Sequence, residues 1–160
     1  MTKKIGAQYP TESVILRYDH ELSRSKSDIE LYEKSGREAY EWQVNVLEPM
    51  MAIDEDGLWV HMKFGYAIPR QNGKNEVVAM RELKGLYDSE RIMHTAHRTT
   101  TSKAAFNRLL KIMEESGLEE KTHFIKNKAI GAEFIRLIDG GEIHFRTRSS
   151  LGGLESLLTY

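Results

Sequence analysis

A short polar loop between two apolar segments carries the residues of this chain that are best suited to chemistry. The loop reads Pro69-Arg70-Gln71-Asn72-Gly73-Lys74-Asn75. Loop amides and the positive N-terminus of a following helix can together bind the phosphates of a nucleotide. Gly73 lets the backbone approach a phosphate closely, and Lys74 can reach the β- and γ-phosphates. The order of strand, loop, Gly-Lys and helix therefore indicates a nucleotide triphosphate site.

The loop departs at two positions from the usual P-loop pattern, G-x-x-x-x-G-K-[ST]. Ile68 stands where that pattern has glycine, and Asn75 stands where it has serine or threonine. The alternative is a surface turn, because Asn-Gly is a strong turn dipeptide. The flanking residues favour nucleotide binding, since residues 64–68 are typical of a buried strand and residues 76–87 of an amphipathic helix.

Two amide side chains are candidate ligands beside this loop. The amide oxygen of Asn75 can ligate Mg²⁺, or the side chain can cap the helix that follows. Gln43 can pair its donor and acceptor with the edge of an adenine. The alternative for Gln43 is a polar position on a helix whose neighbouring Trp42 packs in the core. Both residues are candidates for the nucleotide site.

The elements that must position these residues alternate between helix and strand patterns. Residues 1–27 are expected to form an N-terminal arm, after which a helical pattern with Ser27 or Asp28 as cap covers residues 29–52 and breaks near Ser35-Gly36. The other expected helices cover residues 76–87 and 99–116, and the second ends at Gly117. The expected strands cover residues 58–68, 91–96, 122–126, 133–138 and 142–148.

This alternation predicts an α/β fold with a parallel core and antiparallel strands near the C-terminus. Asp139-Gly140-Gly141 is expected to form the turn of a hairpin. A length of 160 residues and a hydrophobic content of 40% suit one domain with a real core. No segment approaches the roughly 18 consecutive apolar residues of a membrane span, so no membrane association is expected.

Composition limits the remaining chemistry. The chain has no cysteine, which excludes disulfides, thiolate metal sites and a thiol nucleophile. His94, His97 and His123 have no carboxylate pattern that would complete a metal site, so a structural or surface role is expected. The 23 basic and 24 acidic residues nearly cancel. Residues 91–148 hold 11 basic and 7 acidic residues, an excess of +4, so the remainder carries −5, which is ordinary for a solvated surface.

Four segments in order resemble one family, the large subunits of tailed-phage terminases, which are DNA-packaging ATPases. The loop after its apolar segment resembles their deviant Walker A motif, and Glu41-Trp42-Gln43 resembles the Trp-Gln pair upstream of it. His94-Thr95-Ala96-His97 and the helical pattern at 99–109 resemble the strand and helix that follow it. Residues 138–149 resemble the late strand and Arg-Ser segment ahead of the Walker B motif.

The resemblance implies a P-loop NTPase fold of the RecA/ASCE-like kind, a parallel sheet with flanking helices, incomplete within residues 28–160. It implies ATP and Mg²⁺ as cofactors, and the loop residues 69–75 with Trp42 and Gln43 as their binding site. Duplex phage DNA, a portal protein and a small terminase subunit are the implied partners, and the intact protein is expected to form a homo-oligomeric ring. A viral or prophage protein of this kind is expected in the host cytoplasm.

Three arginines take roles through the resemblance. Arg70, at the base of the loop, would sense or stabilise the γ-phosphate; the alternative is a surface arginine. Arg146 or Arg148 would reach the γ-phosphate of a neighbouring subunit; the alternative is the solvated basic end of a strand. Both lie two residues apart on an expected strand and so point to one face.

The chain departs from the family after Arg148. Residues 149–160 contain no apolar strand ending in Asp-Glu, which is the Walker B motif, and no nuclease domain follows. We therefore expect a truncated or fragmentary ATPase that binds nucleotide without turning it over, because hydrolysis needs a held metal and an oriented water. The alternatives are a non-catalytic nucleotide-binding remnant of a prophage terminase, or a different, helicase-like P-loop ATPase.

Overall fold

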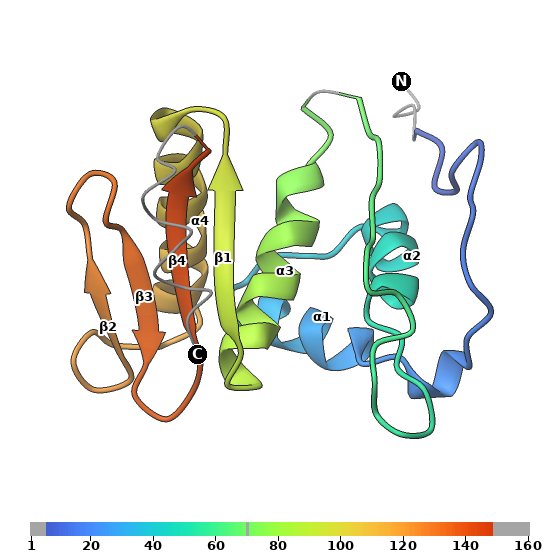
Figure 1. Cartoon of the computed structure of the whole chain (residues 1–160), viewed down its shortest axis with the longest axis horizontal. Helices are drawn as coiled ribbons and strands as arrows, with labels where there is room; N and C mark the ends of the chain where they lie inside the picture. Colours follow the sequence, from blue (N-terminus) through green and yellow to red (C-terminus); the bar gives the residue numbers. More distant parts are fainter. Residues whose placement is uncertain (1–5, 70, 149–160) are drawn as a thin grey trace.

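The computed structural model describes residues 6–69 and 71–148, and Arg70 lies outside them (Figure 1). A short 3₁₀ turn, η1 (His20–Leu22), precedes the first helix. The α-helices are α1 (Ser25–Glu33), α2 (Glu41–Met50), α3 (Lys74–Tyr87) and α4 (Thr99–Glu115). The strands are β1 (Arg91–Ala96), β2 (Phe124–Asn127), β3 (Phe134–Leu137) and β4 (Glu142–Thr147).

The four strands form one mixed sheet in the order β1-β4-β3-β2. β1 runs parallel to β4, with Arg91 opposite Glu142 and Ala96 opposite Thr147, while β3 is antiparallel to both β4 and β2. The expected hairpin is confirmed, and the amide of Leu137 donates to the carbonyl of Gly141 across it at 3.0 Å. The predicted α/β class and the antiparallel strands near the C-terminus are confirmed, but the parallel core is reduced to one pair, β1 and β4, among the described strands.

The expected strand at residues 58–68 is wrong. Trp59 makes an isolated bridge with Ile53, and no ladder forms along the rest of the segment. The β-prone residues there join none of the described strands, whose order is β1-β4-β3-β2, so the strand expected before the polar loop does not form. The segment instead runs extended toward α3, and the Tyr66 hydroxyl donates to the carbonyl of Lys74 at 2.8 Å.

The first helical pattern begins earlier than expected and splits in two. α1 starts at Ser25 with Arg24 as its N-cap, so neither Ser27 nor Asp28 caps it. Ser27 is inside the first turn and its hydroxyl donates to the Arg24 carbonyl, while Asp28 is buried against α3. The predicted break near Gly36 is confirmed, since φ there is +77° and α2 begins only at Glu41.

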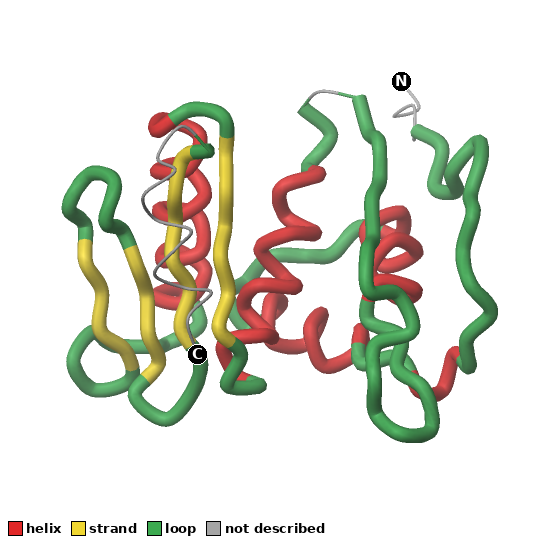
Figure 2. Tube along the Cα trace, viewed as in Figure 1, coloured by secondary structure: helices red, strands yellow, loops and turns green. Residues whose placement is uncertain are grey.

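The core lies between the sheet and the helices. α3 and α4 pack against one face of the sheet, and α1 and α2 pack on α3, on the side away from α4 (Figure 2). The helix expected at 99–116 buries Phe106, Leu109, Ile112 and Met113 here. Ile143 and Phe145 of β4 meet it from the sheet. In the described part of the chain, no helix has the length and apolar character needed to cross a membrane.

Candidate nucleotide-binding site

The polar loop ends where α3 begins, and Gly73 makes the turn between them. Gly73 is the N-cap of α3 with φ +75°, a left-handed conformation that favours glycine. Asn72 donates its side-chain amide to the Pro69 carbonyl at 3.4 Å, and Gln71 also has a positive φ, 65°. Lys74 and Asn75 are exposed in the first turn of α3. This helix N-terminus therefore presents its amide groups and a lysine at the loop, as anion binding requires.

The loop lies at the edge of the molecule toward which the parallel strands point. Figure 1 shows the arrowheads of β1 and β4 at the same end as the first turn of α3. Ligands of open α/β sheets bind beyond the carboxyl ends of the parallel strands. The position of the loop in the fold is thus the position at which such a sheet holds a ligand.

Two side chains distant in sequence hold the backbone of this turn. Gln43 is 1% exposed, and its Nε2 donates to the Gly73 carbonyl at 3.2 Å while its Oε1 accepts from the Tyr40 amide at 2.9 Å. The Tyr66 hydroxyl donates to the Lys74 carbonyl. Burial, aided by the charge of Glu82, raises the pKa of Tyr66 to about 12, so the hydroxyl keeps its proton and remains a donor.

Gln43 and Trp42, the pair predicted from the sequence to belong to this site, lie next to Gly73. A Cβ added at Gly73 would lie 3.1 Å from Nε2 of Gln43 and 3.8 Å from the Trp42 ring. The structure therefore brings Trp42 and Gln43 to the loop, 30 residues along the chain. Both ends of the Gln43 amide are engaged with backbone groups, so reading an adenine edge would require those bonds to be exchanged. The adenine role stays a prediction, and the positioning of Gly73 is what the contacts show.

A carboxylate in the first turn of α3 is tied to two neighbours. Oε2 of Glu76 accepts from the Tyr32 hydroxyl at 2.7 Å, and Oε1 pairs with Nε of Arg108 at 2.8 Å. Burial first, and then the hydrogen bond to Glu76 and its charge, raise the pKa of Tyr32. Glu76 thus joins α1, α3 and α4 directly beneath the loop, and its negative charge is balanced by Arg108 instead of facing the loop alone.

A small crevice of about 70 Å³ opens beside Asn75 between α3 and α4. Its lining includes Glu82 and His94, whose Oε1 and Nδ1 lie 2.5 Å apart and link α3 to β1. This contact agrees with the structural role expected for His94. Glu82 was not among the residues predicted from the sequence, although a carboxylate on the apolar stripe of a helix is a signal of a buried pair.

Asn75 is the second residue of α3, so the alternative in which it caps the helix is wrong. Its exposed amide can meet an ion only together with other ligands. Within the described residues, no group of three or more His, Cys, Asp or Glu side chains could hold a metal. Oxygen ligands from a bound nucleotide would therefore have to complete any Mg²⁺ shell here, as is usual for this ion.

The predicted arginines are not gathered at the loop by any described contact. Arg146 lies on the sheet face opposite α4, and its guanidinium donates to the carbonyls of Glu133 and Phe145 at 3.0 and 2.8 Å. Arg148 follows β4 and lies 3.4 Å from the ring of His97. Arg70 and residues 149–160, where the Walker B motif was sought, lie outside the described residues.

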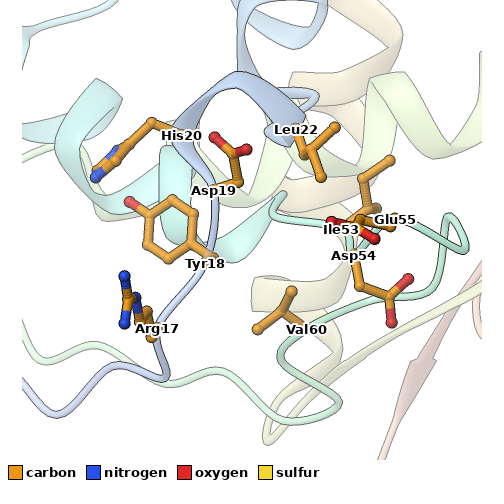
Figure 3. Close-up of a pocket in the computed structure, with 9 residues that line it drawn as sticks. All are labelled: Arg17, Tyr18, Asp19, His20, Leu22, Ile53, Asp54, Glu55 and Val60. Carbon is orange, nitrogen blue, oxygen red and sulfur yellow. The ribbon is translucent and has the colours of Figure 1, made fainter.

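A second, larger hollow of the described chain lies away from the loop. It measures about 480 Å³ and is open to solvent between the N-terminal segment and the turn after α2 (Figure 3). Figure 3 shows Tyr18 and Arg17 on one side and Asp54 and Glu55 on the other. Asp54 already accepts the amides of Asp56 and Leu58. Asp54 on this wall therefore stabilises the fold of its own turn.

Comparisons of this chain with protein-family models, with curated proteins and with solved structures found no match. The assignment of the site therefore depends on the geometry of the loop and on the order of the sequence motifs.

Proposed function

We propose that this chain is the nucleotide-binding portion of a terminase large-subunit ATPase, holding ATP at the Gly73 turn. The observation that carries the proposal is the left-handed Gly73 at the N-terminus of α3, followed at once by the exposed Lys74. A helix N-terminus and a lysine together favour a polyphosphate. Arg70 would add a second positive charge from the base of the loop, and Mg²⁺ would bridge the phosphates beside Asn75.

The upstream Trp-Gln pair supports the family within the larger P-loop class. Gln43 and Trp42 lie against the loop, as a motif with a role at this site must. The Gly73 turn by itself also fits a helicase-like P-loop ATPase, which remains the second candidate. In the intact terminase, ATP hydrolysis by a homo-oligomeric ring in the host cytoplasm would drive duplex DNA through a portal into a procapsid, with Arg146 or Arg148 reaching the next subunit.

This chain would bind ATP without hydrolysing it. In-line attack on the γ-phosphate needs a metal held on its second side and a group that orients water. Glu76 is the carboxylate nearest the loop in sequence, and both of its oxygens are engaged with Tyr32 and Arg108. The proposal therefore separates binding, which the loop supplies, from turnover, which a Walker B carboxylate would supply.

Intrinsic fluorescence tests the proposal through Trp42, which lies at the turn. In a Trp59→Phe background, Trp42 is the remaining tryptophan. We expect MgATP to change its emission in a saturable way, and Lys74→Ala to shift the midpoint to higher concentration. Lys63→Ala, at an exposed lysine of the preceding segment, is the matched control and should leave the midpoint unchanged. An emission that stays constant, together with no heat of ATP binding, would reject the proposal.

A further inference from the structure

The face of the sheet turned away from α3 and α4 has a composition of its own. Alternation along the strands puts Ile143 and Phe145 on the helix side and their neighbours on the other face. Figures 1 and 2 show no described helix in front of that second face. The register assigns these residues to it: Arg91, Met93, Thr95, Ile125, Asn127, Phe134, Arg136, Glu142, His144 and Arg146.

An aromatic pair occupies the two central strands of this face. Phe134 of β3 and His144 of β4 are direct cross-strand partners, and their rings lie 5.7 Å apart at 36°. Burial, with the nearby charge of Arg146, lowers the pKa of His144 against the opposite effect of Glu142. The ring is therefore neutral near pH 7, and 18% of the His144 side chain is exposed on this face.

Arginines surround this aromatic pair. Arg91 and Arg136 both bind Glu142, at 3.2 Å from Nε of Arg91 and 2.7 Å from Nε of Arg136. Their side chains nevertheless remain 63% and 50% exposed, and Arg136 also lies 5.8 Å from the centre of the Phe134 ring. With Arg146, three arginines face one glutamate, so the face carries two net positive charges with His144 neutral.

We propose that this face binds single-stranded nucleic acid, with bases stacked on Phe134 and His144 and phosphates held by Arg91 and Arg136. Aromatic rings on the central strands of an open sheet, with cations around them, are the requirements for stacking splayed-out bases. A duplex keeps its bases paired and cannot present their faces to a flat sheet. A single strand can stack its bases on the two rings and also place its phosphates beside the arginines. This inference is independent of ATP binding at the Gly73 turn.

Fluorescence anisotropy of a labelled 20-nucleotide oligothymidine, titrated with the full chain, tests the proposal. We expect saturable binding that weakens with salt, since phosphate contacts release counterions. Phe134→Leu and the double variant Arg91→Gln/Arg136→Gln should each weaken it about tenfold, whereas Phe134→Tyr should retain it. The control is Lys111→Gln, on the exposed side of α4, where the side chain is 67% exposed; it should have no effect beyond a small loss from net charge.

Three results would overturn the proposal. They are no binding of the oligonucleotide, equal binding of a 20-base-pair duplex, and an equal loss in Lys111→Gln and the double arginine variant. Thermal unfolding of each variant identifies loss of fold, and the exposed Arg136→Gln change alone gives a second test if Phe134→Leu does not fold. The Lys74→Ala variant should bind the oligonucleotide normally, so a failure here is distinct from a failure of the nucleotide site.

Discussion

Asp28 gives the sharpest prediction about the stability of this protein. The carboxylate is 0% exposed, and neither of its oxygens has a hydrogen-bond partner. Burial is the main cause that raises its pKa, to about 8. The nearby positive charges of Arg81 and Lys84 oppose that shift, and the negative charges of Asp88 and Glu90 add to it. Asp28 is therefore protonated in the folded protein at neutral pH.

The sign of the pH dependence follows from this raised pKa. Below pH 3.8, its ordinary value, Asp28 holds a proton in both the folded and the unfolded chain. Between that value and about 8, the unfolded chain ionises while the folded chain keeps its proton. The unfolded state is thereby favoured by about 1.4 kcal/mol for each pH unit. From pH 5 to pH 7 this single group lowers the free energy of unfolding by roughly 3 kcal/mol.

The perturbation is Asp28→Asn, which keeps the shape of the protonated acid and cannot ionise. We expect the stability of the variant relative to wild type to rise by roughly 3 kcal/mol between pH 5 and pH 7. Urea unfolding followed by circular dichroism at pH 5, 6 and 7 measures it. Asp56→Asn, the same change at an exposed position, is the matched control and should track wild type. If the Asp28→Asn and wild-type curves stay parallel across this range, the buried protonated carboxyl is refuted.

Three further predictions concern the loop. Gly73→Ala places a side chain in a left-handed turn, close to Gln43. The variant should therefore lower the free energy of unfolding by about 1 kcal/mol and weaken ATP binding. An unchanged midpoint of urea unfolding would contradict the turn geometry. Asn75→Ser should increase the gain in ATP affinity on adding Mg²⁺, and calorimetry with no change would show that this residue does not face the metal. Phosphate release with Mg²⁺ should not exceed that of Lys74→Ala, with or without duplex DNA, and turnover well above it would place an unrecognised carboxylate at the γ-phosphate.

Elements with a complete local signal could be predicted from the sequence. β1 has the bounds 91–96 that were expected from the sequence, and α4 differs from its expected range by one residue. Both elements are predicted by short-range sequence patterns. The end of α4 is marked by Gly117, which has a φ of +88°. The hairpin between β3 and β4 could also be predicted, because its turn residues fix the register locally.

Features that depend on distant partners could not be predicted. Residues 58–68 have the composition of a strand, but a strand forms only where another strand supplies its hydrogen bonds. Asp28 is a residue type that often caps helices, but tertiary packing buries it. No local sequence pattern reveals this burial. The contact between Gln43 and Gly73 was suggested only by the order of the motifs. The sheet face with Phe134 and His144 could be identified only from the strand register.

Calorimetric titration of the full chain with MgATP tests the central claim of a phosphate-binding turn at Gly73-Lys74 most directly. Removing the Lys74 ammonium takes away a charge-assisted contact worth roughly 1.5–3 kcal/mol, so Lys74→Ala should bind ATP about tenfold more weakly or worse. Lys63→Ala should bind as wild type does. Equal ATP affinity of wild type and Lys74→Ala, or no binding by wild type, would contradict the account.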